Sequence, residues 1–368
     1  MTSRAVVIAG GGTAGHVLPA LSVAESLMDL GYRREDIHYV GAQRGVETRL
    51  VPPVGVPHTF LDVIGLRRSL HPRNLTFVLK LLRARRAAIS LLRRVRPAVV
   101  VSVGGYASLP AVLAARRLRI PVVVISYDKR PGRASAFAAR RASASAVAFA
   151  DSPLPRAVHT GAPLRRAIIE VDRVADRARA RADLGVPEDR FLLVVMGGSL
   201  GSGVLNDAIA AYVEQHAQRR DLAVRHICGE RFLAHAQPSR DGSAGILYDV
   251  VGFEPRMAQV YAAADLLVGR GGASTVCEVA AVGVPAVLVP WAGAAEDHQT
   301  ENVRSLADVG AAVLLPESQL TAERFTAEVD RLMADDAART ALGAAAYAEG
   351  AIHRSGALAR LIDEVARG

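Results

Sequence analysis

The sequence predicts an α/β protein with two domains, each built on a parallel sheet that helices cover on both faces. Short β-branched runs alternate with amphipathic helical stretches along all 368 residues. A chain of that length exceeds what one hydrophobic core usually covers. The strand-like runs are apolar throughout, as in parallel sheets covered on both sides. The halves also echo one another, because each begins with a strand, a glycine-rich turn and a helix.

The first predicted strand, Ala5–Ala9, runs into the turn Gly10–Gly15 and a helix. The second half begins in the same way, with a strand over Leu192–Met196 and the turn Gly197–Gly203. The other predicted strands are, in chain order, Ile37–Val40, Ala98–Val103, Val122–Ser126, Ala146–Phe149, Val224–Ile227, Leu266–Val268, Ala286–Val289 and Ala312–Leu315.

The domain boundary is predicted after residue 163, which gives domains of residues 1–163 and 164–349. A charged, alanine-rich helix is predicted soon after it, over Asp172–Leu184. The C-terminal stretch Ala337–Arg367 is predicted to be helix interrupted near Gly350, with no strand left to pair.

The composition excludes several classes of protein. Hydrophobic residues make up 51% of the chain and charged residues 22%, which is ordinary for a soluble protein. The two cysteines, Cys228 and Cys277, indicate neither a disulfide framework nor a zinc site. The N-terminus lacks the pattern of a signal peptide, and no apolar stretch reaches the roughly 20 residues that span a bilayer. We therefore expect a cytoplasmic protein that no signal of its own exports or threads through a membrane.

The net charge of +9 is concentrated in one part of the chain. No acidic residue occurs between Asp62 and Asp128, whereas arginines are frequent there. Such a block implies an anionic partner: nucleic acid, anionic lipid or a phosphorylated substrate. Nucleic acid is disfavoured because the block lacks the interleaved aromatic residues of a stacking surface.

Within this block, the segment 74–96 is predicted to form a helix that rests on an anionic bilayer, with its basic side chains near the lipid headgroups. The alternative is that its apolar stripe faces the core while the arginines are solvated. The residues predicted to make the membrane patch are Leu75, Leu79, Lys80, Leu82, Arg83 and Arg86.

Four glycine turns, at Gly10–Gly15, Gly104–Gly105, Gly197–Gly203 and Gly271–Gly272, each lead toward a helix. Unpaired N–H groups and the positive end of the helix dipole make such turns anion sites. The alternative is that each only turns the chain. A dinucleotide site is excluded, because the second strand ends in "GAQ" without the required carboxylate. A Walker loop is excluded too, because no turn is followed by Gly-Lys-Ser/Thr.

Polar residues after the fourth turn suit a nucleotide sugar. Glu278, four residues after Ser274, is placed to accept hydrogen bonds from ribose hydroxyls. The alternative is a glutamate that stabilises a helix start. His298 and Gln299 begin a further helix, where they either bind sugar hydroxyls or cap the helix.

Six motifs occur in the order and spacing of one family: "GGGTAGHVLPAL", "VSVGGYASLP", "TGAPLRR", "MGGSLGSGVLN", "GRGGASTVCEVAAVGVPAVLVP" and "AEDHQTENV". On these motifs the chain resembles the MurG family of bacterial glycosyltransferases over nearly its whole length. The resemblance implies a GT-B fold, with two Rossmann-like domains facing across a cleft and a final helix, about 350–368, that completes the first domain. It also implies inverting transfer of N-acetylglucosamine from UDP-N-acetylglucosamine to undecaprenyl-pyrophosphoryl-N-acetylmuramoyl pentapeptide, at the cytoplasmic face of the plasma membrane. Implied protein partners are those of cell-wall synthesis and division.

Carried over by motif, the implied residues fall into two groups. Those that face the acceptor pyrophosphate are Gly11, Gly12, Gly104, Gly105 and Tyr106. Those that bind the donor are Thr13, Gly15, Arg165, Gly198, Ser199, Phe253, Ser274, Glu278, His298 and Gln299.

The chain departs from the family pattern after the fifth strand. Where the family usually has His-Glu-x-Asn, this sequence places Ile125, Ser126 and Asp128, and Leu200 stands where the family commonly has Gln. The first departure bears on the acceptor and the second on the donor.

Two residues are candidates for the base that deprotonates the acceptor hydroxyl. An imidazole ordinarily titrates near neutrality, and His16 lies in the first glycine loop. The alternative is that His16 only orients that loop. Asp128 competes with it, since desolvation can raise the pKa of an aspartate. No Asp-x-Asp metal motif occurs, so we expect catalysis without a metal or other cofactor. The competing functions are a GT-B transferase with another lipid or natural-product acceptor, and a UDP-N-acetylglucosamine 2-epimerase.

Overall fold

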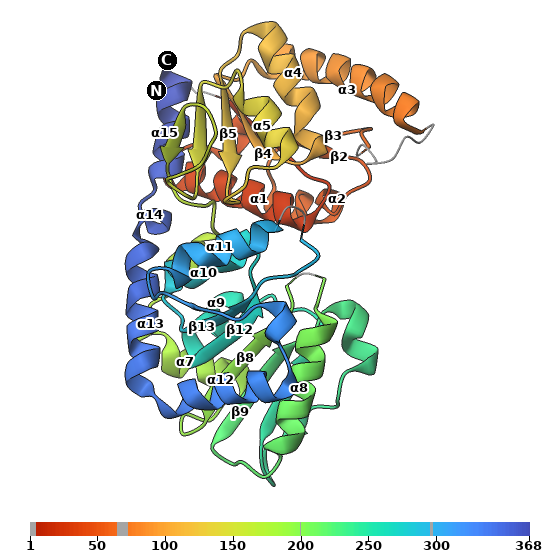
Figure 1. Cartoon of the computed structure of the whole chain (residues 1–368). Helices are drawn as coiled ribbons and strands as arrows, with labels where there is room; N and C mark the ends of the chain where they lie inside the picture. Colours follow the sequence, from red (N-terminus) through yellow and green to blue (C-terminus); the bar gives the residue numbers. More distant parts are fainter. Residues whose placement is uncertain (1–4, 65–72, 199, 295–296) are drawn as a thin grey trace. The chain divides into compact units, whose positions relative to one another are not determined.

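The computed structural model describes residues 5–64, 73–198, 200–294 and 297–368, without the side chains of Ala14 and of residues 73–78. The chain divides into two compact units, one of Met1–Arg166 with Ile352–Gly368 and one of Ala167–Ala351. Each unit has a seven-stranded sheet with helices on both faces (Figure 1), so the predicted α/β class is confirmed.

The sheet of the first unit is entirely parallel, with strand order β3-β2-β1-β4-β5-β6-β7. The chain order reverses between β1 and β4, as in the doubly wound folds. The strands are β1 (Val6–Gly10), β2 (Ile37–Ala42), β3 (His58–Leu61), β4 (Val99–Gly104), β5 (Val122–Ser126), β6 (Ala144–Val147) and β7 (Ala157–His159).

Two apolar layers cover this sheet, because alternate strand residues point to opposite faces. Val7 packs in the layer beneath α3, α4 and α5, whereas Val6 packs with α1 and α15. The C-terminal helix α15, blue in Figure 1, therefore belongs to the first sheet. The helices are α1 (Ala14–Asp29), α2 (Glu47–Leu50), α3 (Arg73–Val95), α4 (Leu109–Leu118), α5 (Arg133–Ala139) and α15 (Ala357–Arg367).

The second unit repeats the arrangement, with strand order β10-β11-β9-β8-β12-β13-β14 and its reversal between β8 and β12. Only the short edge strand β10 is antiparallel. The strands are β8 (Phe191–Met196), β9 (Leu222–Ile227), β10 (Arg240–Asp241), β11 (Leu247–Val251), β12 (Leu266–Arg270), β13 (Ala286–Val289) and β14 (Val313–Leu314).

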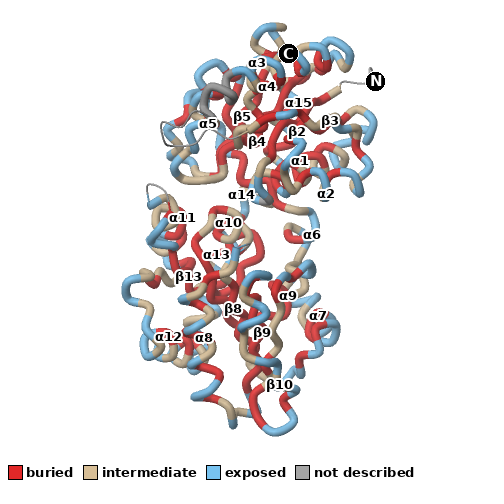
Figure 2. Tube along the Cα trace, turned by 90° about the vertical axis from the view of Figure 1, so that its right-hand side faces the viewer, coloured by how far each residue is buried: buried red, intermediate tan, exposed pale blue. Residues whose placement is uncertain are grey.

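Helices cover both faces of this sheet as well. Figure 2 shows in red that the central strands of each unit are buried. The helices are α7 (Arg177–Leu184), α8 (Gly203–Gln215), α9 (Met257–Ala263), α10 (Ala273–Val282), α11 (His298–Ala307), α12 (Ala322–Ala334) and α13 (Asp336–Glu349). The short helices α6 (Arg166–Ile169) and α14 (Ala351–Arg354) span the two points where the chain passes between units.

Several predicted boundaries were wrong for local reasons. The helix predicted from Asp172 begins at Arg177, because Asp172 Oδ1 accepts hydrogen bonds from the N–H groups of Val174 and Ala175 and forms a turn. The strand predicted over Ala146–Phe149 lies two residues earlier. The C-terminal stretch is interrupted twice, near Gly350 and again before α15.

Candidate functional site

The four glycine turns lie at the carboxyl ends of neighbouring central strands. In the first unit, Gly10–Gly15 follows β1 and Gly104–Gly105 closes β4. In the second, Gly197–Gly203 follows β8 and Gly271–Gly272 follows β12. These strand pairs are the two points at which chain order reverses, and open α/β sheets bind ligands in front of such points. Each unit therefore has one candidate ligand site, at the carboxyl ends of its central strands.

The two glycine turns of the first unit pack directly on each other. Gly105 has a φ of +73°, and a Cβ there would lie 2.5 Å from the carbonyl oxygen of Gly11. At Gly104, with a φ of +93°, a Cβ would lie 3.2 Å from Cδ2 of His16. The backbone at both positions favours glycine, and a Cβ at Gly105 would collide with the Gly11 carbonyl. Glycine therefore lets the imidazole lie against the second turn.

His16 is held by its own loop. Its Nδ1 lies 3.0 Å from Thr13 Oγ1, and no hydrogen bond to Nε2 is present among the described residues. Burial lowers the pKa of the imidazole below its ordinary value, while the negative charges of Asp128 and Glu47 act in the opposite direction. The net effect favours the neutral ring at neutral pH, which is the form that accepts a proton.

A carboxylate that the sequence analysis did not single out lies beneath the first glycine loop. Glu47, the first residue of α2, is fully buried. Its Oε1 accepts hydrogen bonds from the N–H of Gly12 at 3.0 Å and of Ala42 at 2.7 Å. Tyr39 and Tyr106 lie near it, and burial followed by the Glu47 charge raises the pKa of both phenols. The amide of Gly12, predicted to face a pyrophosphate, is thus engaged by the protein itself.

The segment that departs from the family pattern begins inside the sheet. Ile125 and Ser126 are the last residues of β5, and both are buried. Asp128 is partly exposed, and its charge reaches His16. The hydroxyl of Tyr127 donates to the carbonyl of Gly15, which ties this segment to the first glycine loop. The structure thus brings the two candidate bases together.

In the second unit, a buried arginine supports the glycine turn after β8. Ser202 caps α8, accepting a 3.5 Å hydrogen bond from Leu205 N–H at its Oγ. Arg270, the last residue of β12, donates from Nη2 to the same Oγ at 2.6 Å. Its Nη1 pairs with Glu317. Arg270 therefore links the two glycine turns of this unit. It was not predicted, because the strand expected from the sequence ended at Val268, two residues before it.

Glu278 projects from α10, as the sequence predicted, but it does not stand alone. The hydroxyl of Tyr261, on α9, donates to Glu278 Oε2 at 2.7 Å. Tyr261 is fully buried, so it fixes the orientation of the carboxylate at the second site. Tyr261 was not predicted from the sequence, because an aromatic residue in an apolar helix is ordinarily part of the hydrophobic core.

The start of α11 is built from polar side chains that bind backbone. Gln299 Oε1 accepts a 2.9 Å hydrogen bond from Trp291 N–H. Asn302 is fully buried, and its Nδ2 lies 3.5 Å from the carbonyl of Gly271. His298 is the first residue of the helix and is partly exposed. Part of this polar cluster thus shapes the loop between β13 and α11.

The loop after β11 displays an aromatic side chain. Phe253 is 62% exposed, and its neighbour Glu254 is buried and bound by Arg225 Nε at 2.9 Å and by the N–H of Arg256 at 2.8 Å. Burial acts to raise the pKa of Glu254, but these hydrogen bonds and charges lower it overall. The ionised Glu254 therefore anchors the loop on which Phe253 is displayed.

The remaining predicted donor residues differ in setting. Arg165 is partly exposed near the end of the first unit's main segment. Gly198 has a φ of +75°, and Ser274 is partly exposed in the first turn of α10. Ser199 lies outside the described residues. Leu200 is 69% exposed, so an apolar side chain faces solvent beside the turn after β8.

Helix α3 has one packed face and one exposed face. The packed face contacts α4 and the sheet through Ala84, Ala88, Leu91 and Leu92. The exposed face, which we call the α3 patch, consists of Leu79 (58% exposed), Leu82 (46% exposed), Arg83 and Arg86. The alternative that the whole apolar stripe faces the core is therefore wrong for these two leucines.

Lys80 differs from the other predicted patch residues. Its Nζ donates to both oxygens of Asp62, at 2.7 and 2.8 Å. This ion pair lowers the pKa of Asp62 and offsets the lysine charge. The side chain of Leu75 lies outside the described part of the structure.

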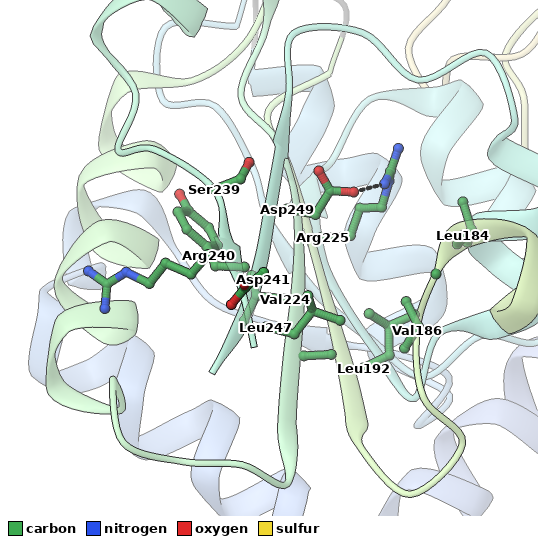
Figure 3. Close-up of a pocket in the computed structure, with 13 residues that line it drawn as sticks. Leu184, Val186, Leu192, Val224, Arg225, Ser239, Arg240, Asp241, Leu247 and Asp249 are labelled. Atoms are coloured by element: carbon green, nitrogen blue, oxygen red, sulfur yellow. Dashed lines mark hydrogen bonds and ion pairs between the residues drawn. The ribbon is translucent and has the colours of Figure 1, made fainter. Parts of the chain in front are cut away.

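A cavity of about 340 Å³ lies away from the glycine turns (Figure 3). Leu192 and Leu247, at the amino ends of β8 and β11, line its apolar part, opposite the end of β8 that carries Gly197. Arg225 and Asp249 pair at its edge. None of the predicted site residues lines this cavity.

Neither a metal-binding cluster nor a membrane-spanning helix occurs among the described residues. In that part of the chain, no group of three or more His, Cys, Asp or Glu side chains is arranged to hold a metal ion. No helix there combines the length and apolar character needed to cross a bilayer.

Comparison with known families covers most of the chain. Residues 6–147 match the glycosyltransferase family 28 N-terminal domain, and residues 192–355 match its C-terminal domain. The chain is 40% identical to a UDP-N-acetylglucosamine–N-acetylmuramyl-(pentapeptide) pyrophosphoryl-undecaprenol N-acetylglucosamine transferase from Nocardioides sp., over 99% of this chain and 98% of that protein.

Solved structures agree with this relationship. The crystal structure of MurG from Acinetobacter baumannii superposes with a TM-score of 0.75 at 28% identity, covering 98% of this chain and 99% of that one. A UDP-GlcNAc 2-epimerase from Neisseria meningitidis, crystallised with UDP-GlcNAc, has a TM-score of 0.66 at 12% identity over 98% of each chain. At that identity the second likeness shows the shared fold alone. The GT-B fold predicted from the motifs is confirmed.

Proposed function

The chain belongs to the MurG family within glycosyltransferase family 28, and from this premise we propose its reaction. It transfers N-acetylglucosamine from UDP-N-acetylglucosamine to the N-acetylmuramoyl 4-hydroxyl of undecaprenyl-pyrophosphoryl-N-acetylmuramoyl pentapeptide, and so converts lipid I to lipid II. The observation that carries the proposal is the pair of candidate sites, one at the strand-order reversal of each unit, because the reaction needs one site for each phosphorylated substrate.

The acceptor is assigned to the first unit, with His16 as the base that removes the hydroxyl proton. The ring is largely neutral at neutral pH, and its Nδ1 is held by Thr13. The acceptor oxygen then attacks the anomeric carbon as the bond to UDP breaks. The carboxylate of Asp128 stabilises the imidazolium that forms, since opposite charges favour the protonated ring. Asp128 itself remains the competing base.

The donor is assigned to the second unit. Glu278, oriented by Tyr261, accepts hydrogen bonds from the ribose, and Phe253 lies against the uracil. His298 and Gln299 face the donor sugar. The charge that develops on the departing UDP is met by the N-terminus of α8 at the Gly197–Gly203 turn. These groups do not require a metal ion, so we propose metal-independent transfer.

The α3 patch is proposed to rest on the anionic cytoplasmic leaflet, where a lipid-linked acceptor resides. Two half-exposed leucines supply apolar contact, and Arg83 and Arg86 supply charge. The protein is thus assigned a peripheral place on the membrane.

The deciding experiment incubates the purified protein with labelled UDP-N-acetylglucosamine and a lipid I analogue. Labelled lipid supports the proposal. Release of the manno epimer without transfer points to an epimerase. If neither the labelled lipid nor the epimer forms, the enzyme uses a different acceptor. Both of these results contradict the proposed reaction.

Variants then separate the two candidate bases. His16→Ala removes the proposed base, and we expect a fall in kcat on the order of 100-fold or more. Asp128→Asn keeps the shape and removes the charge, and it is expected to have the smaller effect. The exposed His235→Ala serves as the matched control. Near-normal turnover of the His16 variant would exclude His16 as the base.

A further inference from the structure

The buried carboxylate of Glu47 has no role in the reaction as described so far. Oε1 accepts two backbone hydrogen bonds, from Gly12 in the first glycine loop and from Ala42 at the end of β2. Oε2 is buried and has no hydrogen-bond partner among the described residues. A fully buried carboxyl group with one oxygen left without a hydrogen bond destabilises the fold. Because Glu47 lies beneath the loop that carries His16, a functional role in that loop would explain why it is buried there.

The packing around Glu47 shows that the site is shaped to hold the carboxylate. A Cβ at Gly11 would lie 2.3 Å from Oε1, and a Cβ at Gly45 would lie 1.8 Å from Oε2. A Cβ at Gly41 would lie 3.0 Å from Cγ. Three glycines on two segments thus leave the space that the glutamate occupies. The carboxylate is therefore enclosed on both sides by backbone without side chains.

We propose that Glu47 is a positioning residue for His16. By binding the amide of Gly12 it fixes the turn on which Thr13 and His16 are carried, and it places a carboxyl group beneath that turn. The inference rests on the proposed function only in naming the proton acceptor; the positioning itself is a property of the first unit alone.

Two consequences follow for the reaction. The charge of Glu47 favours the imidazolium that forms when His16 takes the proton, in the same sense as Asp128 does. The other groups that border the ring's loop are phenols: Tyr106 beside Gly12, and Tyr127, which binds the carbonyl of Gly15. The Gly12 amide, in turn, is not a contact for the acceptor pyrophosphate, because Glu47 occupies it.

The test compares three variants by activity and by NMR titration of labelled histidine imidazoles, with the His16 signal assigned from its loss in His16→Ala. Glu47→Gln keeps the shape and the acceptor oxygen but removes the charge. Gly45→Ala leaves Glu47 in place but drives a methyl group into its carboxylate. Glu35→Gln, at a 63% exposed side chain, is the matched control.

We expect both Glu47→Gln and Gly45→Ala to move the His16 titration to lower pH, and Glu35→Gln to leave it unchanged. In the transfer assay both variants lower kcat by on the order of tenfold to 100-fold, as a small misplacement of a catalytic group does.

The outcomes distinguish this inference from the proposed function. If wild-type protein transfers no sugar, the proposed function fails, while the NMR titration still tests the positioning. If the His16 titration and kcat are unchanged in both variants, Glu47 does not position His16. If both variants lose the folded state while Glu35→Gln keeps it, Glu47 serves stability alone and the inference is overturned.

Discussion

The α3 patch allows a prediction whose size follows from the structure. Leu79 is 58% exposed and Leu82 is 46% exposed. Full burial of a leucine side chain contributes about 1.5–3 kcal/mol. Roughly half of that remains available at each position, so we expect Leu79→Ala with Leu82→Ala to weaken membrane binding by about 2 kcal/mol. That corresponds to a roughly 30-fold lower partition coefficient.

The charges of the patch make a separate contribution. Each basic residue near an anionic surface contributes on the order of 1 kcal/mol, so Arg83→Gln with Arg86→Gln has an effect of similar size at low salt. Lys80→Gln has a much smaller effect, because Asp62 already offsets that charge. For the same reason Asp62→Asn strengthens binding.

The assay is flotation with vesicles of phosphatidylglycerol and phosphatidylethanolamine, compared with phosphatidylcholine alone. Raising the salt to about 1 M shortens the Debye length to about 3 Å and removes the arginine contribution, while the leucine contribution stays. Leu233→Ala with Arg220→Gln, at exposed positions of the second unit, is the matched control.

Three results would refute the reasoning about the patch. Binding that ignores lipid charge excludes the electrostatic part. A leucine pair that alters binding no more than the control pair excludes the apolar part. A Lys80→Gln effect as large as that of Arg83→Gln shows that the ion pair with Asp62 does not offset the charge.

Three further predictions concern the donor site, acid stability and metals. Measured by calorimetry, Glu278→Gln raises the Kd of UDP by roughly 10- to 100-fold, since hydrogen bonds to a charged group contribute about 1.5–3 kcal/mol. Tyr261→Phe has a smaller effect on this Kd. An unchanged Kd in Glu278→Gln contradicts the assignment of Glu278 to the ribose. Burial lowers the pKa of His226 to about 4, so the unfolded state binds more protons than the folded state below pH 6.5. As the pH is lowered from 6.5 to 4, the free energy of unfolding therefore falls by about 1.4 kcal/mol per pH unit. Denaturant titrations of His226→Gln should show a shallower pH dependence than those of the wild type. Transfer persists in EDTA, and activity that is lost there and restored by a divalent cation argues against the metal-independent scheme.

The parts of the candidate site that are formed by backbone, namely the glycine turns, could be predicted from the sequence. Glycine turns after apolar strands are local patterns, so the sequence located all four turns and the helices that follow them. Glu278 was predicted because its spacing from Ser274 is measured along one helix. The edge strands β3, β7 and β10 and the neighbouring β11 were missed, because each is short or carries polar residues that match no apolar run.

Contacts between residues that are far apart in the sequence could not be predicted from it. Glu47 is separated from Gly12 by 35 positions, and Tyr261 comes to Glu278 from a different helix. Nothing in the residues around Glu47 marks it as buried, since a glutamate near a helix start is ordinarily a solvated residue that favours the dipole.

By itself, the sequence determined the class of fold, the family and the positions of the glycine turns, because these depend on patterns within short segments. Only the tertiary structure decided which charges act at the site. Packing places Glu47 and Asp128 around His16, and it pairs Lys80 with Asp62 while leaving Arg83 and Arg86 on an exposed face. The physical reason is that burial and charge pairing depend on distance in space, and the distance along the chain does not set them.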